Sequence, residues 1–240
     1  PVLQFLDSPT NGILIADEVG LGKTIEAGLI WTELQAREDA RRLLVVCPAM
    51  LCEKWKRELA NRFGVKASIV DAHELLRQLE EVKRQPQQEF SLIASLQGIR
   101  PPRGWNDEDE PSNAAAARLA RLLDESDLEE PLIDMVIIDE AHYLRNQDTQ
   151  TYRLGALLRP AAQHMVMLSA TPIQMRNRDL FNLVHLLDED AFPYEQSFEW
   201  TLRANAPIVD LRDRVLGSII TQQDFVSAVA TAQALSWFED

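Results

Sequence analysis

The sequence predicts an α/β protein with a mostly parallel sheet that helices cover on both faces. Two observations carry this prediction. Short apolar runs alternate with longer amphipathic segments along most of the 240 residues, as strands and helices do in parallel α/β folds. The apolar runs are also continuous, as in strands buried on both faces, and Leu43–Cys47, ended by Pro48, is the clearest example. None of these runs approaches the ~20 residues that a membrane-spanning helix needs, so we expect no membrane association.

The expected strands are apolar runs bounded by turn residues. Ile13–Ala16 precedes a glycine-bearing loop, and Met135–Ile138 precedes two carboxylates. In chain order, the expected strands are residues 13–16, 43–47, 65–70, 90–95, 135–138 and 164–168.

The expected helices have an apolar residue at every third or fourth position. Leu51–Phe63 repeats its apolar residues every four positions, and Gly64 is a typical stop. In the helix that begins at Thr24, we expect Ile25, Leu29, Ile30 and Leu34 to lie on one apolar face. In chain order, the expected helices are residues 24–37, 51–63, 73–84, 114–123, 149–158 and 178–187.

We expect these elements to form one domain over residues 1–190. A proline-bounded polar loop, a short helix and an acidic stretch interrupt the pattern at about residues 101–131, and we interpret them as a surface insertion. Later helical patterns span residues 195–204, 209–216 and 223–238. Residues 191–240 are therefore expected to be a helical extension or a linker toward another domain. The chain starts at Pro1 without an initiator Met or a signal peptide, which suggests an excised domain.

Residues 12–24 have the organisation of a phosphate-binding loop between a strand and a helix. Gly20 and Gly22 lack a Cβ, so the backbone can direct N–H groups at phosphate oxygens, and the helix adds the positive end of its dipole. Lys23 would reach the β- and γ-phosphates, and the Thr24 hydroxyl would ligate Mg²⁺. Because Asp17 stands where the common pattern has its first glycine, an ordinary helix-capping turn is the alternative for this loop alone.

The overall charge limits how the chain can meet nucleic acid. Its 24 basic and 38 acidic residues give a formal net charge of −14. A net-acidic domain is a poor candidate for tight nucleic-acid binding through bulk electrostatics. Any contact with DNA must therefore be local, or shared with a basic partner domain.

The two cysteines, Cys47 and Cys52, predict the cellular compartment. The sequence has no other cysteine and no nearby histidine to complete a tetrahedral metal site with them. We therefore expect free thiols in a reducing compartment, the cytoplasm.

Two adjacent carboxylates, Asp139 and Glu140, end an apolar strand. At the carboxyl edge of a parallel sheet they would emerge beside the phosphate loop. Asp139 can hold Mg²⁺, through a water, while Glu140 can orient and deprotonate the water that attacks the γ-phosphate. A strand that simply ends in a polar turn is the alternative, and Lys23 and Thr24 upstream disfavour it.

Three further residues are expected at the same edge. We assign His142 a contact with the water-side carboxylate or with the next motif, without a chemical step of its own. Ser169 and Thr171 follow the next strand, and their hydroxyls could bond to His142 or Glu140 and respond to the phosphate state. They could also only satisfy backbone groups before Pro172.

Four motifs stand in the order found in superfamily 2 helicases. They are Asp17–Thr24 (DEVGLGKT), Val46–Leu51 (VCPAML) followed by Trp55, Asp139–His142 (DEAH) and Ser169–Gln174 (SATPIQ). In detail they resemble the Swi/Snf-type DNA-translocating ATPases, a family that tolerates Asp at position 17. The form of Val19–Gly28 (VGLGKTIEAG) is similar to that of the bacterial branch around RapA (HepA). The resemblance covers about residues 12–190.

This resemblance implies a RecA-like P-loop fold with three αβα layers, forming the first lobe of a two-lobe motor. ATP and Mg²⁺ would be its cofactors, and duplex DNA, gripped together with the second lobe, its main partner. The residues implied in nucleotide binding are Glu18, Val19, Gly20, Leu21, Gly22, Lys23 and Thr24. Those implied in DNA contact are Pro48, Ala49, Met50, Ser95 and Gln97.

The resemblance also bears on partners and activity. Protein partners such as RNA polymerase or defence-system subunits are compatible with it, as is a location on the nucleoid. In this family the arginine finger lies in the second lobe, so we expect the 240-residue chain alone to hydrolyse ATP poorly. The adenine-reading glutamine of the family lies upstream of the loop, where Gln4 is a weak candidate.

Two other functions stay open at this point. A nucleotide-dependent docking module without motor activity would suit the acidic surface and the insertion at 101–131. An RNA helicase lobe would account for the sequence at 139–142 alone, although the phosphate loop and the Ser169–Gln174 motif disfavour it.

Overall fold

The computed structural model describes residues 2–6, 10–16, 22–107, 112–126, 130–170, 176–216 and 229–230. The chain divides into two compact units, Pro1–Glu189 and Asp190–Asp240, and each is described by itself. No helix within the described ranges is long and apolar enough to cross a membrane.

Among the described residues, unit 1 contains one six-stranded sheet with the strand order β1-β6-β5-β2-β4-β3, and every pairing is parallel. The strands are β1 (Gly12–Ala16), β2 (Arg42–Cys47), β3 (Ser68–Val70), β4 (Phe90–Ser95), β5 (Ile133–Asp139) and β6 (Ala162–Ser169). The third strand is shorter than expected and begins at Ser68. The expected parallel sheet is present.

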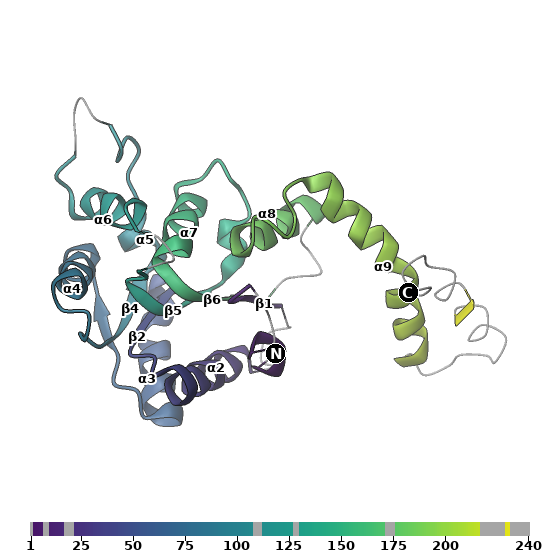
Figure 1. Ribbon diagram of the computed structural model, residues 1–240, viewed down its shortest axis with the longest axis horizontal. Helices are drawn as coiled ribbons and strands as arrows, with labels where there is room; N and C mark the ends of the chain where they lie inside the picture. The colour runs from purple at the N-terminus through teal and green to yellow at the C-terminus, as the bar shows by residue number, and fades with distance from the viewer. Residues whose placement is uncertain are drawn as a thin grey trace. The chain divides into compact units, whose positions relative to one another are not determined.

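Helices cover both faces of this sheet (Figure 1). One face packs against α1 (Val2–Leu6), α2 (Lys23–Glu38) and α3 (Cys52–Phe63). The other packs against α4 (Ala72–Arg84), α5 (Leu96–Ile99), α6 (Ala115–Asp124), α7 (Gln150–Ala161) and α8 (Asn177–Leu187). Two short 3₁₀ helices, η1 (Ala49–Leu51) and η2 (Ala141–Leu144), follow β2 and β5.

The central strand β5 shows why the apolar runs are continuous. Met135 and Ile137 belong to the core on the α2 side, whereas Val136 and Ile138 belong to the core on the α7 side. Successive side chains of a strand point to opposite faces. A strand covered on both faces therefore needs an apolar residue at every position.

The buried face of α2 differs in part from the expected one. Ile30 and Leu34 are buried as expected, together with Ala27 and Trp31, whereas Ile25 and Leu29 are exposed. The expectation of one apolar face was therefore wrong for Ile25 and Leu29. The apolar residues of α2 spread around more than one stripe, and which stripe is buried depends on where α3 packs.

Gly28 explains how closely α2 and α3 approach. A Cβ at this position would lie 2.2 Å from the ring of Phe63. Such a contact is far shorter than van der Waals separation, so any larger residue at position 28 would require the ring of Phe63 to move.

The segment at about 101–131 contains part of the core as well as polar surface. Trp105 and the apolar face of α6 are buried in the cluster that also holds α4. Arg121 donates to the backbone carbonyls of Trp105 (2.8 Å) and Ser112 (2.6 Å) and so holds the preceding loop against α6. Residues 108–111 and 127–129, most of which are acidic, lie outside the described ranges.

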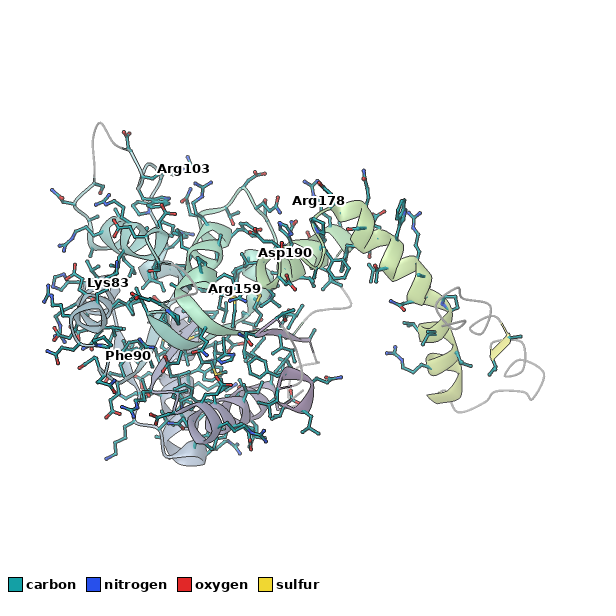
Figure 2. All side chains as sticks on the ribbon, viewed as in Figure 1. Lys83, Phe90, Arg103, Arg159, Arg178 and Asp190 are labelled. Carbon is teal, nitrogen blue, oxygen red and sulfur yellow. The ribbon has the colours of Figure 1, made fainter. Side chains whose placement is uncertain are left out.

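Arg159, which is labelled in Figure 2, joins segments that lie far apart in the sequence. Its guanidinium donates to the carbonyls of Leu187 (2.9 Å), Ala162 (3.3 Å) and Thr10 (3.0 Å). The pKa of Arg159 is lowered by burial. Its contacts link the end of α8 to the beginnings of β6 and β1.

In unit 2, the described structure is mainly α9 (Glu195–Leu216), and Phe192 packs edge-on against Phe198. The sequence pattern predicted two separate helices here, at residues 195–204 and 209–216. Instead α9 continues through Pro207. The third expected helix, at 223–238, falls almost entirely outside the described ranges.

Candidate active site at the carboxyl edge of the sheet

The strand order places the predicted chemical groups at one edge. Because all strands are parallel, their carboxyl ends share this edge. β6 lies between β1 and β5, with Ala16 paired to Ser169 and Asp139 paired to Leu168. The strand that leads into the phosphate loop is thus separated from the two carboxylates by one strand only.

Of the phosphate loop, the structure describes Gly22, Lys23 and Thr24, while residues 17–21 lie outside the described ranges. Gly22 has the left-handed φ of 93° and its carbonyl accepts from the N–H groups of Ile25 (2.7 Å) and Glu26 (3.1 Å). Within the described residues, no side chain caps α2 at Gly22. The helix therefore begins at Lys23, with its first N–H groups directed toward the loop.

The carboxylate of Asp139 is held by two donors. Its Oδ2 accepts from Nε1 of Trp55 at 2.8 Å, and its Oδ1 accepts from the backbone N–H of Glu140 at 2.8 Å. Each oxygen has a further lone pair available. Carboxylate and hydroxyl oxygens are the ligands that Mg²⁺ prefers, so Asp139 and the Thr24 hydroxyl fit a magnesium ion.

Glu140 stands directly after β5 in a left-handed conformation, with φ 54°. Oε2 of Glu140 lies 3.1 Å from Nδ1 of His142. That nitrogen makes no aligned hydrogen bond with the described residues. The two groups are thus in electrostatic contact without the geometry of a full hydrogen bond.

Ser169 ends β6, between the carboxyl ends of β1 and β5. Its side chain is buried, and its Oγ has no hydrogen-bond partner among the described residues. Thr171, the other hydroxyl expected here, lies outside the described ranges. Ser169 therefore lies between the strand that leads into the phosphate loop and the strand that ends in the two carboxylates. The hydrogen bonds expected for its hydroxyl stay predictions.

The residues implied in DNA contact follow β2 and β4, which are neighbours with Cys47 paired to Ser95. Ala49 and Met50 are exposed, and Met50 is 87% exposed, whereas Pro48 is buried. Ser95 accepts from the N–H of Gly98 at 3.0 Å and so caps α5, on which Gln97 is exposed. Exposed groups from η1 and α5 thus lie side by side at the same edge as the carboxylates.

The thiols of Cys47 and Cys52 border this region, with their sulfur atoms 3.6 Å apart. Burial raises the pKa of the Cys47 thiol, and the neighbouring Cys52 and Asp139 raise it further. Both cysteines are free. Within the described ranges, no cluster of His, Cys, Asp and Glu side chains could hold a metal by itself.

Sequence reasoning missed one contact of this site. The sequence pattern identified Trp55 only as an apolar residue of the helix at 51–63 and as part of a motif. Neither observation predicted a hydrogen bond to Asp139. The two residues are 84 positions apart. The N–H of a buried indole usually has a hydrogen-bond acceptor. The tryptophan in the apolar stripe of this helix was therefore the feature of the sequence that could have predicted a polar partner.

Comparisons with known proteins agree with this arrangement. The family model described as SNF2-related domain matches residues 3–226. The uncharacterized ATP-dependent helicase YqhH of Bacillus subtilis is 32% identical over 230 residues, which cover 90% of this chain and 34% of that protein. The RNA polymerase-associated protein RapA of Yersinia pseudotuberculosis is 30% identical over 240 residues, which cover 93% of this chain and 23% of that protein. The chain thus spans about a third or less of these relatives.

Two solved structures share the fold. The Sulfolobus solfataricus SWI2/SNF2 ATPase core in complex with dsDNA has a TM-score of 0.53 and 15% identity, covering 93% of this chain and 53% of that one. The core domain from the same organism has a TM-score of 0.55 and 19% identity, covering 82% of this chain and 35% of that one. These likenesses confirm the RecA-like, three-layer fold expected for unit 1.

Proposed function

Because the chain belongs to the SNF2-related domain family, we propose that it is the first ATPase lobe of a motor that moves on double-stranded DNA. Lys23 would bind the β- and γ-phosphates of ATP, and Thr24 and Asp139 would hold Mg²⁺. When bound, the ion would neutralise charge that develops on the phosphate oxygens. Glu140 would orient the attacking water and accept its proton.

The observation that supports this proposal best is the strand order around β6. Hydrolysis needs a phosphate-binding helix end and a carboxylate base near one another. The pairings Ala16–Ser169 and Asp139–Leu168 bring the end of β1 and the end of β5 to either side of one strand. The left-handed backbone of Glu140, directly after Asp139, supports giving the two carboxylates different roles, with Asp139 on the metal and Glu140 on the water.

We further propose that duplex DNA binds beside η1 and α5. Exposed Ala49, Met50 and Gln97 gather there, next to the carboxyl edge. The formal net charge of −14 means that the lobe must rely on local contacts and on a second lobe. One structural neighbour is in complex with dsDNA, and RapA is named as RNA polymerase-associated. RNA polymerase is therefore a protein partner that merits testing, and a cytoplasmic location stays a prediction.

The acidic charge also favours a second candidate, a nucleotide-dependent docking module that does not move on DNA. Steady-state ATPase of the longest natural chain that contains this lobe decides between them. Rates should be measured without nucleic acid, with duplex DNA and with RNA, for the wild type and for Glu140→Gln. Glu125→Gln is the matched control, because Glu125 is an exposed carboxylate at the end of α6.

For the motor, duplex DNA should raise turnover strongly. Glu140→Gln should lower it by about 10²- to 10⁴-fold, the contribution typical of a general base, while nucleotide still binds. Glu125→Gln should behave as the wild type. Turnover that is indifferent to duplex DNA would exclude the translocase and favour the docking module. Stimulation by RNA alone would instead indicate an RNA helicase.

A further inference from the structure

We propose that Trp55 is a positioning residue that fixes the carboxylate of Asp139 and links it mechanically to segment 48–51. This inference rests on the proposed role of Asp139 as a magnesium ligand. Trp55 would not touch the nucleotide, the ion or the attacking water. It would act only through Asp139.

The hydrogen bond between Trp55 and Asp139 is short, and its donor is buried. Nε1 of Trp55 donates to Oδ2 of Asp139 at 2.8 Å, and the tryptophan is only 1% exposed. A hydrogen bond to an ionised group in a shielded environment is stronger than one between neutral groups. The donor is therefore shielded from water, whereas the acceptor carboxylate at the end of β5 is only partly buried.

A second donor to Asp139 helps to define the orientation of its carboxylate plane. The backbone N–H of Glu140 binds Oδ1, on the other side of the carboxylate. The terminal torsion of an aspartate is otherwise broad, so one donor alone would leave the plane of the carboxylate poorly defined. Donors from β5's own turn and from α3 together define it.

The link to segment 48–51 follows from chain continuity. α3 begins at Cys52, directly after η1, and the N–H of Leu51 binds the carbonyl of Pro48 at 2.8 Å. Trp55 lies within the first turn of α3. Met50, at 87% exposed, stands at the surface of the same segment. A ligand that displaces this segment would therefore move Trp55, and with it the hydrogen bond to Asp139.

Trp31 provides a matched control for this bond. It is also 1% exposed and lies in α2, in the same apolar cluster. Within the described residues, its Nε1 has no hydrogen-bond partner. Replacing either tryptophan by phenylalanine removes one buried N–H and part of one ring, but only Trp55→Phe removes a bond to a carboxylate.

The test uses the longest natural chain that contains this lobe, without DNA. Binding of a fluorescent ATP analogue is titrated with Mg²⁺ for the wild type, Trp55→Phe and Trp31→Phe, after thermal unfolding has shown each variant to be folded. Loss of a residue that orients a metal ligand typically weakens metal binding about 10- to 100-fold. We expect the Mg²⁺ needed for half-maximal binding to rise by at least about tenfold in Trp55→Phe and to stay within about twofold in Trp31→Phe. Equal shifts in the two variants, or no shift in either, would overturn the positioning role.

A double-mutant cycle with Asp139→Ala tests whether Trp55 acts through that residue. In the Asp139→Ala background, Trp55→Phe should have no further effect on the Mg²⁺ requirement. An undiminished effect there would show that Trp55 acts by another route, and the proposal would fail.

The mechanical link has its own readout. At saturating Mg²⁺, the ratio of ATPase rates with and without duplex DNA should fall in Trp55→Phe and be retained in Trp31→Phe. A wild-type ratio in Trp55→Phe would refute the link. A wild type that does not respond to DNA would instead refute the proposed motor function, and the Mg²⁺ titration, run without DNA, would still decide the role of Trp55.

Discussion

Oε2 of Glu140 lies 3.1 Å from Nδ1 of His142, within the turn that follows β5. Glu140 itself has a left-handed backbone conformation, with φ 54°. The carboxylate of the proposed base is therefore in close contact with a neighbour from its own motif. We expect the histidine to influence turnover through this contact and to leave nucleotide affinity unchanged.

His142→Ala should accordingly lower DNA-stimulated turnover about tenfold, which corresponds to about 1.4 kcal/mol of transition-state stabilisation. The dissociation constant for an ATP analogue should change less than about twofold, since the histidine does not contact the phosphates in the proposed arrangement. The control is His73→Ala, at an exposed position of α4. A loss that appears equally in affinity would contradict this role.

The conformation of Glu140 predicts an unusual ranking of stabilities. At its φ of 54°, an L-residue with a Cβ is disfavoured and glycine is not. Glu140→Gly should therefore be more stable than Glu140→Ala by about 0.5–1 kcal/mol, although both should lose turnover. Urea unfolding measures the difference. The same pair of substitutions at Lys56, exposed within α3, should rank in the opposite order, by about 1 kcal/mol.

Asp134, at the beginning of β5, should be one of the most sensitive positions for stability. It is buried and accepts from the N–H groups of Arg41 (2.6 Å) and Arg42 (2.8 Å) and from Nε of Arg42 (2.8 Å). Asp134→Ala would leave these donors without their acceptor and should lower the free energy of unfolding by about 3–5 kcal/mol. Asp39→Asn, which alters an exposed ion pair with Arg41, should leave stability nearly unchanged. Similar losses in the two variants would exclude this explanation.

The Cys47 thiol predicts how stability depends on pH. Burial raises its pKa in the folded protein, whereas an unfolded cysteine ionises near pH ~8.5. The folded state then binds the proton that the unfolded state releases, so the stabilisation is complete below pH ~8.5 and declines above it. Between about pH 9 and 10, the free energy of unfolding should fall by about 1.4 kcal/mol per pH unit more in the wild type than in Cys47→Ala. Parallel pH profiles for the two proteins would refute the raised pKa.

The local elements of this chain could be predicted because short-range physics determines them. Continuous apolar runs indicated strands buried on both faces, and the structure has strands at each of the six expected places. Glycine and proline positions were less decisive. Gly64 ends α3 as expected, but α9 passes through Pro207, because the loss of one backbone bond can be offset by the rest of a long helix.

The core face of α2 shows where local patterns fail. Its sequence contains apolar residues on several sides, so periodicity alone could not select among them. The contact between Gly28 and the ring of Phe63 selects the orientation, and it leaves Ile25 and Leu29 exposed. Likewise, the segment at 101–131 was distinguishable as an interruption, but burial of Trp105 depends on α4 and α6 packing together.

The sequence by itself determined the α/β class, the order of the motifs and the chemical types of Lys23, Thr24, Asp139 and Glu140, since each depends on neighbouring residues only. Tertiary structure alone decided that β6 lies between β1 and β5 and that the indole of Trp55 binds the carboxylate of Asp139. Strand order and such a long-range bond depend on which surfaces pack best once the whole chain is folded. The periodicity of apolar residues within single elements therefore cannot predict the strand order or this hydrogen bond.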